Sequence, residues 1–167
     1  NLRIASSACS TSRTSTAETT LRPFRLEDAG CIGSWLHSPG LQLPPGQAGR
    51  QWAARMLADP HIGAWVAERD GQRVGFARLD IGPDRIAELT LVVAPGSRRA
   101  GFGNQILGLV LAEAVRRGVR RLCAVVDPAN LIARKFFANN GFEDASCAAG
   151  GAIRMHRPVH RHAAGEP

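Results

Sequence analysis

The feature that most constrains the fold is the run VVAPGSRRAGFGN, which occupies residues 92–104. The β-rich segment 86–93 predicts a strand that ends at Pro95. The segment 101–117 has the apolar spacing of an amphipathic helix, and Gly118 supplies its C-terminal cap. The chain is therefore expected to pass from a strand into a helix through a short glycine-rich loop.

This loop has the properties of an anion-binding site. The first backbone amides of a helix lack intrahelical partners, and the helix dipole adds partial positive charge at that end. Gly101 and Gly103 let a ligand approach the backbone without a Cβ in the way, and Arg98 and Arg99 add full charges. We therefore expect a phosphate group to rest on the backbone amides of residues 98–104.

Two better-known phosphate loops do not fit the run. A P-loop would place a lysine directly after Gly101, where Phe102 stands. A dinucleotide fingerprint would place a third glycine at Ile106. A tight strand-to-helix turn that binds no ligand is the remaining alternative.

The rest of the chain alternates between strand-like and helix-like segments. Strands are expected at 19–25, 64–69, 73–80, 122–126, 142–147 and 152–156, and helices at 27–36, 47–58 and 130–139. With 167 residues, the pattern predicts one mixed α/β (α+β) domain over 19–157, with an antiparallel front half and a βαβ-like back half. Residues 1–18 and 158–167 are polar without periodicity, so we expect flexible tails there.

The amino-acid composition indicates which kinds of ligand and partner to expect. The net charge of +7 suits a phosphorylated ligand better than nucleic acid, because the basic residues are not interleaved with aromatic ones. No pair of the four cysteines has C-x-x-C spacing, so we expect reduced thiols in a cytoplasmic protein and no metal. No stretch approaches the ~20 apolar residues of a membrane-spanning helix. Neither nucleic acid nor a membrane is expected as a partner, and homodimer formation stays open.

Two stretches together resemble the acetyl-CoA signatures of the GNAT superfamily of N-acetyltransferases. The first is Arg-x-x-Gly-x-Gly at 98–103, after a strand that ends in Val-x-Pro. The second is DPANLIARKFFANNGF at 127–142, similar to the family pattern Asn-x-x-Ala-x-x-Phe-Tyr-x-x-x-Gly-Phe. The resemblance extends over residues 21–155. It implies a mostly antiparallel central sheet, flanked by helices, with a V-shaped splay between two parallel strands.

The resemblance also implies roles for individual residues, with acetyl-CoA as the co-substrate. Pantetheine would pair with the backbone of Leu91, Val92 and Val93. Pyrophosphate would rest on the loop residues Arg98, Arg99, Ala100, Gly101, Phe102, Gly103 and Asn104. Asn130 would either contact the pantetheine arm or cap its own helix, and Phe136 and Phe137 would pack near the thioester.

Acetyl transfer requires the acceptor amine to lose a proton, and Glu88 is the candidate base. An exposed strand residue or an ion-pair partner is the alternative role for Glu88. The amide of Val92 or Val93 would polarise the thioester oxygen. The family usually has tyrosine, as an acid, at the position of Phe137, and this chain has no tyrosine. Water, Ser146 or Cys147 could take its place.

Three functions remain after this reading. The chain could acetylate a primary amine of a small molecule, or a protein N-terminus or lysine, or it could bind acyl-CoA without catalysis. Glu88 favours the two enzymes, and the absence of tyrosine favours the silent module. Because like charges repel, the basic composition favours an acceptor amine attached to an anionic group over a polycation.

Overall fold

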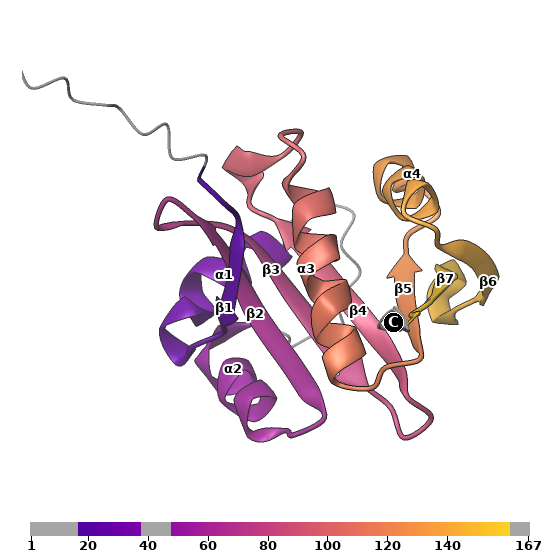
Figure 1. Cartoon of the computed structure of the whole chain (residues 1–167), viewed down its shortest axis with the longest axis horizontal. Coiled ribbons are helices and arrows are strands. Elements are labelled where there is room, and N and C mark those ends of the chain that lie inside the picture. The colour runs from indigo at the N-terminus through magenta and orange to yellow at the C-terminus, as the bar shows by residue number, and fades with distance from the viewer. Residues whose placement is uncertain (1–16, 38–47, 161–167) are drawn as a thin grey trace, which may run out of the picture.

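A computed structural model describes residues 17–37 and 48–160 of the chain (Figure 1). The remaining parts of the expected tails, 1–16 and 161–167, lie outside the described residues. The strands are β1 (Thr20–Pro23), β2 (Ile62–Arg69), β3 (Gln72–Ile81), β4 (Ile86–Val93), β5 (Arg121–Val126), β6 (Glu143–Cys147) and β7 (Ile153–Pro158). The helices are α1 (Ala29–Leu36), α2 (Gly49–Ala58), α3 (Phe102–Arg116) and α4 (Leu131–Asn139), with short 3₁₀ turns at Leu26–Asp28, Pro95–Ser97 and Ala149–Gly151.

The described strands form one sheet in the order β1-β2-β3-β4-β5-β7-β6. Neighbouring strands are antiparallel except β4 and β5, which are parallel. β4 and β5 pair at only three positions, Ile86–Arg121, Ala87–Leu122 and Glu88–Cys123. Beyond Glu88 the two strands separate, and Figure 1 shows α3 lying over β3 and β4 next to this separation. The mixed sheet with a splay between two parallel strands confirms the expected fold class.

Alternation along the strands gives the sheet two apolar faces. One face packs against α3 and α4 through residues such as Leu89, Ile106 and Leu122. The other face packs against α1 and α2, where Phe24, Trp52 and Phe76 form edge-to-face ring pairs with centroids 5.7–6.3 Å apart. The two helical layers therefore enclose the sheet around β2, β3 and β4, which fixes the position of the β4–α3 loop.

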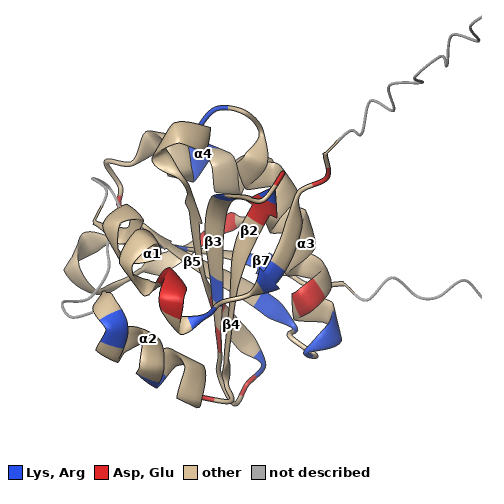
Figure 2. Cartoon of the chain, turned by 90° about the vertical axis from the view of Figure 1, so that its left-hand side faces the viewer, with Lys and Arg blue, Asp and Glu red and all other residues tan. Residues whose placement is uncertain are grey.

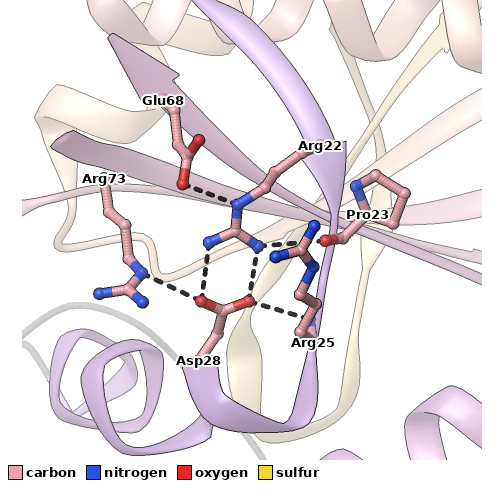
Figure 3. A network of polar contacts seen from close by, with 6 residues as sticks. All are labelled: Arg22, Pro23, Arg25, Asp28, Glu68 and Arg73. Carbon is pink, nitrogen blue, oxygen red and sulfur yellow. Dashed lines mark hydrogen bonds and ion pairs between the residues drawn. The ribbon is translucent and has the colours of Figure 1, made fainter. Parts of the chain in front are cut away.

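A buried carboxylate anchors the first strand (Figure 3). The Asp28 side chain is 1% exposed and accepts two hydrogen bonds from the Arg22 guanidinium, at 2.8 and 2.9 Å. Arg73 and the backbone N–H of Arg25 also donate to it, and Arg22 pairs with Glu68 at 2.7 Å. The network ties β1 to its neighbour β2, to β3 beyond it and to the turn that leads into α1.

Each helix and strand expected from the sequence occurs within a few residues of its expected bounds. The last two strands form an antiparallel hairpin, in which β7 lies between β5 and β6 and β6 forms the sheet edge. β7 also includes Pro158, and the N–H of Val159 donates to Arg120 at 2.9 Å. None of the described helices combines the length and apolar character needed to cross a membrane.

Candidate coenzyme and acyl-transfer site

The splay leaves part of β4 with one free hydrogen-bonding edge. The N–H of Ala94 donates to Val74 on β3 at 2.9 Å, so by antiparallel alternation Val92 also directs its peptide groups at β3. Leu91 and Val93 then direct theirs at the gap beside β5. Of the three strand residues expected to contact pantetheine through their backbone, these two have the required direction.

A cavity of about 530 Å³ begins at this edge and extends to the N-terminus of α3. It is lined by the end of β4, the loop after it, the first turn of α3 and one side of α4. All the predicted coenzyme-binding residues line it except Ala100, which is exposed on the loop. These are Leu91, Val92, Val93, Arg98, Arg99, Gly101, Phe102, Gly103, Asn104, Asn130 and Phe137.

The loop has the backbone geometry of an anion-binding turn. Gly101 adopts φ +79° directly before α3, and Arg99 adopts φ +64°, which is uncommon for a residue with a side chain. A Cβ at Gly103 would lie 3.0 Å from the Phe136 ring, so any larger residue would have to displace this ring where α3 passes α4. The Arg69 guanidinium lies 5.6 Å from the centroid of the Phe102 ring and holds the start of α3 from its outer side.

Helix α4 forms the opposite wall. The Asn130 side chain accepts a hydrogen bond from the N–H of Ala133 at 3.1 Å, so it caps α4 and also lines the cavity. The Asn140 side-chain amide donates to Asn104 at 3.0 Å and to the Phe136 carbonyl at 2.8 Å. This amide bridges α3 and α4 beside the end of the cavity at the N-terminus of α3.

Phe137 is 8% exposed and packs edge-to-face with Phe136 and Phe142, with ring centroids 5.2 and 4.9 Å away. It occupies the position of the family tyrosine and lines the cavity, but it has no proton to donate. The two proposed substitutes, Ser146 and Cys147, lie exposed on β6 at the sheet edge. Two strand spacings separate β6 from β5, so neither residue is adjacent to the splay.

Glu88 lies at the last position at which β4 pairs with β5, opposite Cys123, and it faces Asp80 on β3. It is exposed, and its carboxylate has no hydrogen bond or ion pair among the residues that the structure describes. It does not line the cavity, and lies where the gap between β4 and β5 opens. A carboxylate in this position can reach an amine that approaches the gap from outside the coenzyme cavity.

Several residues that line the cavity were not expected there, namely Trp35, Ser97, Ile132 and Ala133. Ile132 and Ala133 lie within the second motif, residues 127–142, so the motif could have predicted their place in the cavity wall. Trp35 gave no such signal, because its position depends on how α1 packs beside the end of β4. Within residues 17–37 and 48–160, no three His, Cys, Asp or Glu side chains are grouped so as to hold a metal ion.

Known proteins share both the sequence pattern and the fold. The family model described as "Acetyltransferase (GNAT) family" matches residues 27–142. An uncharacterised N-acetyltransferase of Mycobacterium bovis is 36% identical over 91 residues, which cover 54% of this chain and 58% of that protein. A mycothiol acetyltransferase of Cellulomonas flavigena is 42% identical over 64 residues, 37% of this chain and 18% of that protein.

The matched region thus spans little more than half of the mycobacterial relative and less than a fifth of the second protein. A solved spermidine N-acetyltransferase of Vibrio cholerae, in complex with CoA and spermine, matches 85% of this chain and 96% of its own. Its TM-score is 0.74 at 17% identity, which shows a common fold.

Proposed function

Because the chain belongs to the acetyltransferase (GNAT) family, we propose that it transfers an acetyl group from acetyl-CoA to a primary amine of a small molecule. The observation that carries the proposal is the cavity that joins the free edge of β4 to the N-terminus of α3. One end of the cavity suits the diphosphate of a coenzyme, and the other ends beside a carboxylate.

The residues present fit CoA. The amides at the start of α3 and the side chains of Arg98 and Arg99 offer positive charge to the pyrophosphate. Leu91 and Val93 offer N–H and C=O groups to the two amides of the pantetheine arm, as a neighbouring strand would. Phe136 and Phe137 supply an apolar wall for the rest of the arm.

The transfer proceeds by direct attack within a ternary complex. The amine nitrogen forms a bond to the thioester carbonyl carbon, and the bond from that carbon to sulfur breaks. Glu88 accepts the proton that the amine loses, directly or through water, and the thiolate departs with the electron pair. The N–H of Val93, which faces the gap, donates to the thioester oxygen as negative charge develops there.

The departing thiolate has no tyrosine beside it, because Phe137 occupies that position. A thiol with a pKa near ~8.5 leaves acceptably without prior protonation, so this loss is compatible with catalysis. The phenylalanine at this position also favours the second candidate function, in which the protein binds acyl-CoA without transferring the acyl group. Thiol release is the property that separates the two functions.

The test follows CoA thiol release from acetyl-CoA across a panel of primary amines, together with calorimetric measurement of CoA binding. We expect micromolar CoA binding and amine-dependent thiol release. CoA binding with no release on any small amine or on peptides with a free N-terminus or lysine would favour the silent module. Release with peptides alone would identify a protein acetyltransferase.

A further inference from the structure

A row of polar side chains crosses the sheet where β4 and β5 separate. Glu88 pairs with Cys123 in register, and Cys123 pairs with His156 on β7. Residues opposite one another in register project from the same face, so all three share the face that carries α1 and α2. The apolar core under α1 and α2 includes residues of β2, β3 and β4 but none of β5 or β7.

Arg154 lies on the same face of β7, two residues from His156, and extends back over β5. Its Nη1 donates to the Cys123 sulfur at 3.5 Å. Among the described residues no carboxylate lies within ion-pair distance of Arg154, whereas Arg22, Arg78 and Arg134 each have one. The thiol of Cys123 does not neutralise the guanidinium, because burial raises its pKa and keeps it protonated.

The surroundings of His156 also indicate an excess of positive charge next to Arg154. Its Nε2 is buried and has no hydrogen-bond partner among the described residues. Burial lowers the pKa of His156, and the charges of Arg121 and Arg154 lower it further. Glu143 on β6 lies opposite His156 in register, but it is exposed and does not offset this effect. A buried polar atom without a partner beside an arginine without a carboxylate is an arrangement that an anion would complete.

We propose that Arg154 and His156 bind the anionic group of the acceptor, and that the acceptor is a small primary amine that carries a carboxylate. The inference rests on the proposed acetyl transfer and names its substrate class. The Arg154 guanidinium lies against Cys123, which is one strand spacing, ~4.8 Å, from Glu88. A carboxylate held by Arg154 therefore leaves an amine a few bonds away beside Glu88. The planar guanidinium also matches the geometry of a carboxylate.

The first experiment keeps the protein unchanged and varies the acceptor. CoA thiol release is measured with a set of amino acids, with the corresponding carboxamides, with the decarboxylated amines, and with aminophosphonates. We expect kcat/KM for the amino acid to exceed that for its carboxamide by at least about tenfold, mainly through KM. Equal use of acid and carboxamide would overturn the proposal. Preference for the phosphonate over the carboxylate would overturn the assigned anion.

The second experiment changes the site. Arg154→Gln should raise KM for the amino acid at least about tenfold and leave KM for the carboxamide within about twofold. Arg120→Gln, in the exposed turn before β5, is the matched control and should leave both values unchanged. Melting temperature and CoA affinity are measured for both variants to verify folding. An equal loss on acid and carboxamide would show that Arg154 acts on the structure rather than on the acceptor's anion.

A binding measurement separates this inference from the proposed function. Calorimetry of amino-acid binding to the CoA-loaded protein needs no turnover. Binding that depends on Arg154, with no thiol release from acetyl-CoA, would overturn the transfer reaction and leave the anion site standing. Thiol release with amines but no dependence on Arg154 would overturn the anion site alone.

Discussion

Glu88 and Cys123 form the last register pair of β4 and β5, the parallel strands of the described sheet, so the two strands separate at a carboxylate. On the coenzyme side of this point, Leu91 and Val93 present unpaired peptide groups to the gap. Arg154 and His156 of β7 lie on the far side of β5 from Glu88. The end of the strand pairing is therefore next to the proposed coenzyme site, the proposed base and the proposed acceptor site. Figure 2 shows the strands between α1 and α2 on one side and α3 on the other.

Replacing Glu88 with glutamine should remove the proposed base and leave the size of the side chain nearly unchanged. We expect kcat/KM to fall by about 10²- to 10⁴-fold, with CoA affinity unchanged because Glu88 does not line the cavity. Steady-state thiol release measures kcat/KM, and calorimetry measures CoA affinity. Glu113→Gln, which removes a surface ion pair with Arg116 on α3, is the control and should leave activity unchanged. A Glu88→Gln variant with wild-type activity would exclude Glu88 as the base.

Two glycines of the same segment allow a matched test of the phosphate loop. A Cβ at Gly101 or at Gly108 meets no atom within 4 Å, but Gly101 has φ +79° and lines the cavity, whereas Gly108 is an exposed helical position. Gly101→Glu should weaken CoA binding by more than about tenfold, because it places negative charge at the phosphate site and strains the backbone by about 1–2 kcal/mol. Gly108→Glu should leave CoA affinity unchanged and keep or raise the melting temperature. Equal CoA affinity in both variants would show that the loop does not bind the coenzyme.

The Asp28 network predicts sensitivity to acid. Hydrogen bonds from Arg22 lower the pKa of Asp28 from 3.8 to about 2, against the opposing effect of burial, with further help from the N–H of Arg25 and from Arg73. Because the folded pKa is the lower one, the ionised form stabilises the protein above pH ~4. That stabilisation, about 2 kcal/mol, is lost as the pH falls from ~4 to ~2. Urea unfolding at a series of pH values measures it.

Asp28→Asn should lower the free energy of unfolding at pH 7 by about 3 kcal/mol, because Arg22 then lacks its main partner. The same variant should flatten the pH dependence between ~4 and ~2. Asp70→Asn is the control, since Asp70 lies exposed in the turn after β2 at φ 51°, a conformation that asparagine accepts. An unchanged slope with pH in Asp28→Asn would mean that other carboxylates govern acid unfolding.

Phe137→Tyr restores the hydroxyl that the family usually has at this position. We expect kcat to rise by less than about tenfold, because a thiolate already leaves acceptably without an acid. If the new hydroxyl finds no partner in the ring cluster with Phe136 and Phe142, stability should fall by about 1–3 kcal/mol. Stopped-flow thiol release and thermal melting measure the two effects. A rise above a hundredfold would show that departure of the thiolate limits the natural protein.

The sequence alone determined the local elements and the position of the glycine-rich loop proposed to bind the coenzyme. The strand ended by Pro95, the glycines at 101 and 103 and the helix after them are set by backbone propensities that act over a few residues. Asn130 was expected to cap α4 or to contact the coenzyme, and the structure shows the cap. The sequence also showed that Phe137 replaces the tyrosine usual in the family, because this needs only a comparison of one position with the family motif.

Tertiary structure decided everything that depends on strand order and register. The sequence did not indicate that β7 lies between β5 and β6, nor that Val93 rather than Val92 turns its amide to the gap. Alternation along a strand assigns side chains to two faces, but hydrogen bonding between distant segments decides which strands are neighbours and where their pairing ends. For that reason Arg154 and His156, more than sixty residues after Glu88, meet it only in the folded sheet.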